Sequence, residues 1–227
     1  MTGPLPRALS KQAKERRILD AALAVFCCEG YSGASMDAIA ARAAVSKPTL
    51  YQYFGTKEQL FSAIMLSRRD RMLDAFAHPS PRGMVRDLHR FAWDYADTVM
   101  SPDFLSLARL TIAEAQRFPD IGRAYQSCGP DRLLKGIMDY LTAQRHAGRL
   151  RFDDAELAAQ DLWALILSAA RNQALHIPDP LPTRPEIARY LNNGLRVFLC
   201  AYSTTPDKDH ATLARILAER PIETDPP

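Results

Sequence analysis

The chain has 227 residues, a hydrophobic content of 47% and a formal net charge of +3 at neutral pH. This length is enough for one large or two small domains with a sizeable core. No stretch approaches the roughly 18 consecutive apolar residues of a membrane span, and residues 1–10 lack the apolar segment of a signal peptide. These features exclude a membrane protein and predict a soluble, cytoplasmic one.

The charge is distributed unevenly along the chain. Residues 1–70 contain ten Lys and Arg against six acids, whereas the rest contains nineteen against twenty. A net charge of +3 does not by itself indicate a nucleic-acid-binding protein. A basic N-terminal part is, however, where contacts to phosphate would be expected.

The first predicted helix runs from Ser10 to about Glu29, after a flexible arm at residues 1–9. Its apolar stripe consists of Ile18, Ala22, Val25 and Phe26. Gly30 is predicted to end it, because glycine is the preferred residue just beyond a helix C-terminus.

Two short helices and a tight turn are predicted between Ser35 and Phe54. Ser46 is a suitable N-cap for the second of them, and Pro48 lies in its first turn, where proline is tolerated. Leu50 and Phe54 are four residues apart and would face inward. A helix pair of this size is either an ordinary part of an α-protein or a helix-turn-helix that inserts into the DNA major groove.

A capping box, Thr56-x-x-Gln59, predicts the start of a longer helix directly afterwards. Lys57 then lies at a helix N-terminus, where the helix dipole disfavours a cation. A phosphate that docks at this end would explain the position of Lys57. We expect this helix to continue to about Ala77, before the His78-Pro79-Ser80-Pro81 break.

The remainder of the chain has a helical pattern and no strand pattern. The expected helices cover residues 84–100, 104–117, a short piece ending at 128, 132–147, a helix capped by Asp153 that ends at 176, 183–202 and 207–220. The predicted fold class is therefore all-α.

The segment from Ser35 to Phe61, SMDAIAARAAVSKPTLYQYFGTKEQLF, resembles the DNA-binding domain of TetR-family (tetracycline-repressor-like) transcriptional regulators. The resemblance extends over about residues 17–65, and residues 107–172 more loosely resemble the C-terminal domain of an AcrR/AefR-like branch. Ala44 and Pro48 stand where the family often has glycine. The resemblance implies a helix-turn-helix domain at residues 10–57, followed by a helical ligand-binding and dimerisation domain at residues 58–227.

The resemblance also implies which residues contact DNA. The residues expected to read base edges are Lys47, Pro48, Thr49 and Gln52. The residues expected to hold phosphates are Ser35, Tyr51, Tyr53 and Lys57, and Ser46 is included as the cap of the reading helix. Tyr53 has a second interpretation, since it could pack in the core instead.

The predicted helix that ends at residue 176 and the one over residues 183–202 carry more apolar surface than one buried face requires. They are either wholly core or, as in the family, pair with a second copy into a four-helix bundle. The residues assigned to that homodimer interface are Leu162, Leu165, Ile166, Ala169, Tyr190, Leu191, Gly194, Leu195 and Phe198. A homodimer would place two DNA-binding domains on the half-sites of a palindromic operator.

A pocket for a small-molecule effector is implied by the family and not by the residues themselves. The residues assigned to it are Trp93, Phe104, Arg109, Phe118, Tyr125, Trp163, Arg171 and Asn172. Each aromatic residue at helical spacing could equally belong to the core, and the polar ones could pair with one another.

Other chemistries receive little support from the sequence. Cys27, Cys28, Cys128 and Cys200 show no Cys-x-x-Cys spacing and are expected to be free, buried thiols. The five histidines are never four residues apart, so no metal site is expected. No cofactor or enzyme motif is present. The sequence therefore predicts a DNA-binding repressor that an effector releases, with an activator or a ligand-independent DNA-binding protein as the alternative.

Overall fold

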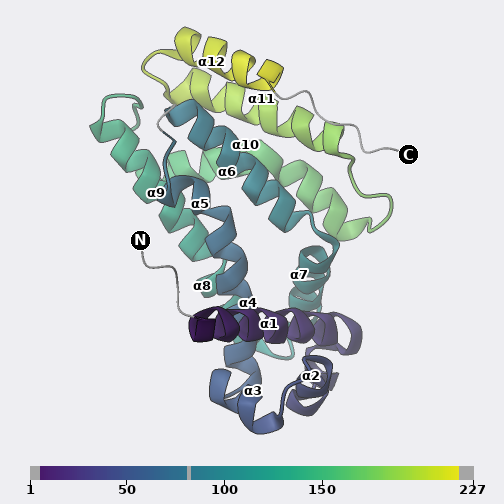
Figure 1. Ribbon diagram of the computed structural model, residues 1–227. Helices are drawn as coiled ribbons and strands as arrows, with labels where there is room; N and C mark the ends of the chain where they lie inside the picture. The colour runs from purple at the N-terminus through teal and green to yellow at the C-terminus, as the bar shows by residue number, and fades with distance from the viewer. Residues whose placement is uncertain (1–5, 81–82, 220–227) are drawn as a thin grey trace. The chain divides into compact units, whose positions relative to one another are not determined.

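The computed structural model describes residues 6–80 and 83–219, and these residues form an all-α fold without strands (Figure 1). In chain order the helices are α1 (Pro6–Gly33), α2 (Met36–Arg42), α3 (Lys47–Tyr53), α4 (Lys57–Met72), α5 (Asp74–Ala77), α6 (Met84–Val99), α7 (Pro102–Glu114), α8 (Pro119–Cys128), α9 (Pro130–His146), α10 (Ala155–His176), α11 (Arg184–Tyr202) and α12 (Pro206–Glu219). Within the described ranges, no helix combines the length and apolar character needed to cross a membrane.

The ends of α1 differ from the sequence-based prediction. The helix begins at Pro6, so residues 6–9 are helical and not part of an arm, while residues 1–5 lie outside the described residues. Gly30 interrupts the helix, with a φ of 74° and a ψ of 170°, but it does not end it as predicted, since α1 continues to Gly33. Gly30 is suited to this break because a residue without Cβ adopts positive φ at little cost.

The helix that starts at Thr56 is shorter than predicted. The capping box forms, since the Thr56 N–H donates to Gln59 Oε1 at 3.2 Å and the Gln59 N–H donates to Thr56 Oγ1 at 3.1 Å. However, α4 ends at Met72 and a separate turn of helix, α5, follows to Ala77. Pro81, predicted as part of the break after it, lies outside the described residues.

The chain divides into two compact units that interleave in sequence. The first consists of residues 1–68 and 102–129, and the second consists of residues 69–101 and 130–227. Helices α7 and α8 therefore belong to the same unit as the predicted helix-turn-helix, although they follow it by more than 30 residues. The predicted domain boundary at residue 57 falls at the start of α4, inside the first compact unit, and stays a prediction.

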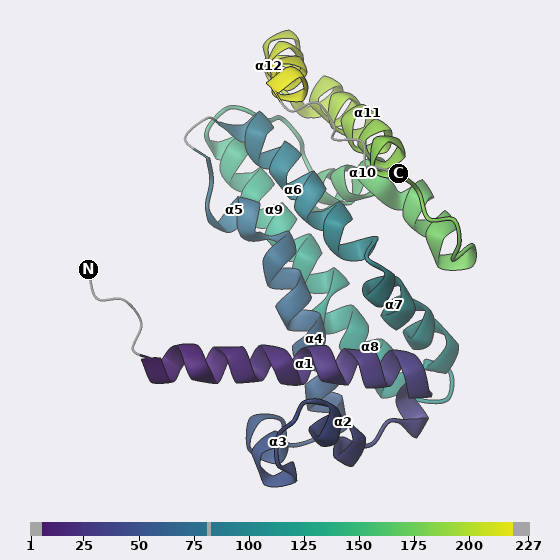
Figure 2. The same cartoon turned by 45° about the vertical axis from the view of Figure 1, so that its right-hand side comes forward.

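In the first unit, α1 packs against both α2 and α7, and α7 packs against α8. Figures 1 and 2 show α2 and α3 on the same side of α1. An aromatic cluster joins α1, α4 and the N-cap residue of α8. Tyr31 contacts the rings of Phe26, Phe61 and Phe118, with centroid separations of 5.6–5.9 Å.

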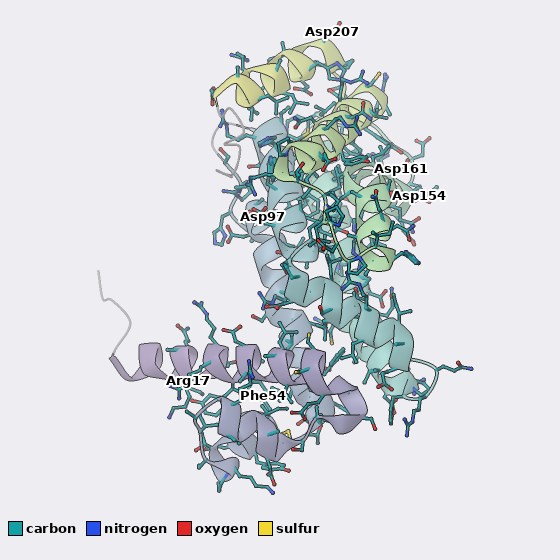
Figure 3. All side chains as sticks on the ribbon, turned by 90° about the vertical axis from the view of Figure 1, so that its right-hand side faces the viewer. Arg17, Phe54, Asp97, Asp154, Asp161 and Asp207 are labelled. Carbon is teal, nitrogen blue, oxygen red and sulfur yellow. The ribbon has the colours of Figure 1, made fainter. Side chains whose placement is uncertain are left out.

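In the second unit, the most extensive helix pair is α10 with α11, and α9 packs on α10. The N-cap of α10 is Asp154, which is labelled in Figure 3, and not the neighbouring Asp153 that the sequence suggested. Its carboxylate accepts the backbone N–H groups of Glu156 and Leu157.

The α10–α11 crossing depends on Gly194. A Cβ at this position would lie 2.4 Å from the Leu165 carbonyl oxygen and 2.9 Å from the Ile166 Cα. Only a residue without a side chain therefore permits the observed approach of the two backbones.

A buried carboxylate links α6 to α9 and to the segment before α6. Asp87 on α6 has only 2% of its surface exposed. It accepts the Ser80 backbone N–H at 2.6 Å and the Tyr140 hydroxyl at 2.9 Å. The Tyr140 ring also stacks on Phe76 with a centroid separation of 4.0 Å. A buried polar group requires such partners, so this network fixes the position of residue 80 against α6 and α9.

Candidate nucleic-acid interface

The α2–turn–α3 segment is fixed by a capping serine at the start of each helix. Ser35 Oγ accepts the Ala38 N–H at 3.1 Å. Ser46 Oγ accepts the Thr49 N–H at 3.3 Å and shares a second hydrogen bond with Thr49 Oγ1 at 2.8 Å. These caps satisfy amide donors that the first helical turn leaves free. Ser35 and Ser46 therefore have a structural role whether or not they also contact DNA.

The turn between the two helices contains a residue in the left-handed conformation. Ala44 has a φ of 49°, in a region that glycine adopts readily and alanine does not. The turn is closed by hydrogen bonds from the Ala44 N–H to the Ala41 carbonyl and from the Val45 N–H to the Ala40 carbonyl. The alanine found where the family often has glycine is thus accommodated in the left-handed position of this turn.

An apolar core lies beneath the two helices. Ile39, Ala43 and Leu50 have no exposed surface, and Phe54 is 7% exposed. These residues occupy the inward positions that their spacing predicts. With the inward face filled, the exposed residues of α3 are Lys47, Pro48, Tyr51 and Gln52.

The predicted contact residues of α3 do not all share that outer surface. Lys47, Pro48, Tyr51 and Gln52 are not buried, and the Tyr51 side chain is 44% exposed. Thr49 is half-buried, and its hydroxyl is already engaged with Ser46. Tyr53 is also half-buried, with its ring 6.2 Å from that of Phe54. The outer face therefore presents an ammonium, a phenol and an amide, groups that donate hydrogen bonds to bases and phosphates.

Lys47 has a partner that its position in the sequence does not reveal. Its Nζ lies 2.8 Å from Asp37 Oδ1 and 3.0 Å from Asp37 Oδ2, on the first turn of α2. This hydrogen bond to Asp37, followed by the charge of the same carboxylate, raises the pKa of Lys47. The two residues are ten positions apart on different helices, so no local sequence pattern predicts this ion pair.

Lys57 has backbone partners where a phosphate had been expected. Its Nζ donates to the carbonyl oxygens of Tyr31 at 2.7 Å and Ala34 at 3.0 Å, and it lies 4.5 Å from the centre of the Tyr31 ring. The Tyr31 hydroxyl in turn donates to Glu58 Oε1 at 3.1 Å. These carbonyl groups account for a cation at the start of α4 without an anion. Since an ammonium has three N–H groups, one N–H of Lys57 is left for a phosphate.

Replacing Lys57 by alanine is expected to lower the free energy of unfolding by about 1–3 kcal/mol, because two carbonyl groups lose a charged donor. Urea denaturation followed by circular dichroism measures this change. If Lys57 also contacts phosphate, the variant should bind all DNA sequences more weakly. The slope of log affinity against log salt concentration, the salt slope, should then decrease in magnitude by about one. A normal slope together with reduced stability would make Lys57 a purely structural residue.

The residues assigned to an effector pocket fall into both compact units. Phe104, Arg109, Phe118 and Tyr125 belong to the first unit, and Trp93, Trp163, Arg171 and Asn172 belong to the second. Several are already packed against other groups: the Trp163 indole donates to the Tyr95 hydroxyl at 2.6 Å, and the Arg184 guanidinium lies 4.3 Å from the Trp93 ring centre. An open groove of about 290 Å³ lies elsewhere, between α11 and α12, and none of the eight residues lines it.

Most of the residues assigned to a dimer interface are buried inside the chain itself. The buried members are Leu162, Ile166, Leu191, Gly194, Leu195 and Phe198. They fill the contact of α10 and α11 with neighbouring helices, so they offer no free surface to a second copy. Leu165, Ala169 and Tyr190 remain at least partly accessible. Leu157 on α10 and Val197 on α11, which the prediction did not assign to the interface, are also exposed, at 57% and 36%.

The cysteines are free as predicted, but they are not buried. Cys27, Cys28 and Cys200 are exposed and Cys128 is half-buried. Although the residue as a whole is exposed, the Cys27 Sγ lies against the Asp103 carbonyl oxygen, at 3.8 Å, and is partly desolvated; this desolvation, followed by the charge of Asp103, raises the pKa of Cys27 to about 11. A thiol with this pKa is almost entirely protonated at neutral pH, which makes Cys27 a poor nucleophile.

Comparison with known proteins agrees with this geometry. Residues 18–64 match the family described as "Bacterial regulatory proteins, tetR family", and residues 86–204 match the "AefR-like transcriptional repressor, C-terminal domain". The chain is 42% identical over 65 residues to the HTH-type transcriptional activator FasR of Mycolicibacterium smegmatis, which covers 29% of this chain and 30% of FasR. The first curated relatives are thus matched over about a third of their own length.

Solved structures are matched over more of the chain. A TetR-family regulator from Mesorhizobium loti is 30% identical, with a TM-score of 0.72 over 85% of this chain and 98% of that one. The flavonoid-responsive regulator FrrA is 29% identical, with a TM-score of 0.65 over 85% of this chain and 98% of FrrA. The chain therefore belongs to the TetR family of bacterial transcriptional regulators and has an AefR-like C-terminal domain.

Proposed function

We propose that this protein is a cytoplasmic, sequence-specific DNA-binding repressor, and not an enzyme. The observation that carries the proposal is the capped α2–turn–α3 segment, whose filled inner face leaves Lys47, Tyr51 and Gln52 exposed on one helix. A short helix with this surface fits the DNA major groove, where such side chains reach base edges and flanking phosphates. In this proposal residues 10–57 form the DNA-reading head.

A homodimer would supply the second head. Leu165 and Ala169 on α10 and Tyr190 on α11 keep accessible surface, and Leu157 and Val197 add apolar area on the same two helices. Apolar residues exposed on neighbouring helices support pairing with a second copy. Two heads would then bind the half-sites of a palindromic operator, about one helical turn or slightly more apart.

Release by a small molecule is the remaining part of the proposal. The similarity to the flavonoid-responsive regulator FrrA supports it, and the match to an AefR-like repressor domain supports repression. An effector would have to bind the DNA-free arrangement of the chain more tightly than the operator-bound one. The alternative of an activator is supported by the similarity to FasR. Reporter expression in a deletion strain separates the two, because loss of a repressor raises expression and loss of an activator lowers it.

Selection of bound fragments from genomic DNA at a stated salt concentration tests DNA binding. The expected result is a palindromic site bound by two chains. Lys47→Ala and Tyr51→Ala should each weaken that binding by about tenfold, since a good contact to a base edge, for Lys47, or a hydrogen bond to a charged phosphate, for Tyr51, contributes about 1–3 kcal/mol. Gel-shift titration measures the change, and circular dichroism confirms that both variants fold. Fragments enriched no better than random DNA would contradict the proposed function.

A further inference from the structure

An acidic residue lies on the surface that is proposed to approach DNA. The Asp37 carboxylate contacts the Lys47 ammonium through both of its oxygens, at 2.8 and 3.0 Å. Both side chains nevertheless remain open to solvent, with 57% of the Lys47 side chain and 65% of the Asp37 side chain exposed. The pair is therefore not a buried structural link, and DNA can reach both groups.

This ion pair changes what Lys47 offers to DNA. A lysine on its own is a flexible point charge that is attracted to any phosphate. Paired with Asp37, its charge is compensated and its ammonium is held beside the first turn of α2. An ammonium has three N–H groups, so one can still donate to a base acceptor while the carboxylate occupies the others. Such an arrangement weakens attraction to the backbone more than it weakens a directed hydrogen bond.

We propose that Asp37 is a specificity-determining residue that acts through Lys47. It reduces the sequence-independent attraction of Lys47 to phosphate and positions the ammonium for a base edge. This inference rests on the proposed function, because it assumes that α3 reads DNA. A simpler role for Asp37, stabilising the N-terminus of α2 through the helix dipole, would affect folding and leave sequence discrimination unchanged.

The test is the ratio of affinity for the selected operator to affinity for random duplex DNA. This ratio is insensitive to the fraction of folded protein, because both affinities are reduced equally. Asp37→Asn should raise affinity for random DNA about two- to fivefold, the range that an exposed ion pair is worth. Its salt slope should become steeper by about one. The ratio should fall by at least the same two- to fivefold factor.

Two further variants test whether Asp37 changes sequence discrimination through Lys47. In a Lys47→Met background, Asp37→Asn should leave the ratio unchanged, because the residue through which it acts is absent. The matched control is Asp120→Asn on α8, which removes the same charge from an exposed ion pair in the same unit, Asp120 with Arg123 at 2.5 Å. This control should not alter the ratio.

The wild-type chain is measured first. A wild-type ratio of one overturns the proposed function and this inference with it. A high wild-type ratio that Asp37→Asn leaves unchanged, or increases, overturns this inference alone. An equal fall of the ratio with Asp120→Asn, or an undiminished effect of Asp37→Asn in the Lys47→Met background, also overturns it, because Asp37 would then act by net charge or by its own contact.

Discussion

Replacing Asp87 by alanine is expected to lower the free energy of unfolding by about 2–4 kcal/mol, because a buried hydrogen-bond network loses its central acceptor. The carboxylate is 2% exposed and accepts both the Ser80 N–H and the Tyr140 hydroxyl. In the variant, the buried Tyr140 hydroxyl loses this acceptor and the shortened side chain leaves a void. Chemical denaturation measures the loss.

Two variants show whether the network is responsible. Tyr140→Phe removes one donor and keeps the ring that stacks on Phe76, so it should cost about 1–2 kcal/mol, and its effect should not add to that of Asp87→Ala. Asp97, which is labelled in Figure 3, lies on the same helix. Asp97→Ala removes a side chain that is 50% exposed and paired with Arg184. It should cost less than about 1 kcal/mol. Equal losses for Asp87→Ala and Asp97→Ala would show that burial of Asp87 adds nothing.

The same network predicts a response to alkaline pH. Desolvation, followed by the hydrogen bond to Asp87, raises the pKa of Tyr140 above its ordinary value of 10. A phenol whose pKa is higher in the folded state stabilises the fold below pH 10, and this stabilisation is lost as the pH rises above 10. Tyr140→Phe should therefore make unfolding less sensitive to pH above 10.

Gly194→Ala is expected to destabilise the protein by about 1–3 kcal/mol, although alanine is the better helix-forming residue. The added methyl group would lie 2.4 Å from the Leu165 carbonyl oxygen, and it meets backbone atoms that cannot rotate away. Helices α10 and α11 would have to move apart or slide along one another. Thermal denaturation followed by circular dichroism measures the change.

The control for this substitution is another helical glycine. At Gly33, an added Cβ would meet only the Glu29 Cβ, at an ordinary distance of 3.6 Å. Gly33→Ala should therefore be neutral or slightly stabilising. If Gly194→Ala behaves in the same way, the close approach of the helices is not what requires glycine. If the exposed residues of α10 and α11 form the dimer contact, Gly194→Ala should weaken dimerisation as well.

The parts of the fold that depend on local sequence could be predicted closely. Ser35 and Ser46 cap the helices they were assigned to, and the Thr56–Gln59 capping box forms as predicted. Each of these interactions joins residues three positions apart, so the pattern is visible in the sequence. The inward faces of α2 and α3 were predictable for the same reason.

Interactions between distant residues could not be predicted. The carbonyl partners of Lys57 lie 23 and 26 residues before it, and Asp37 lies ten residues before Lys47. Along α10, Leu162 and Leu165 are equally apolar, yet the first is fully buried and the second is 38% exposed. Composition alone does not tell which of two apolar faces is covered by the same chain. The base and phosphate contacts themselves stay predictions.

The membership of α7 and α8 in the first compact unit has a consequence for engineering the protein. A hybrid regulator made by joining residues 1–57 to a foreign C-terminal domain would separate α1 from the α7 surface against which it packs. Such a graft would expose apolar residues of α1 unless residues 58–68 of α4, together with α7 and α8, were transplanted with residues 1–57. The portable module is therefore discontinuous in sequence, and exchange of operator specificity is more safely achieved by substituting surface residues of α2 and α3 than by exchanging whole heads.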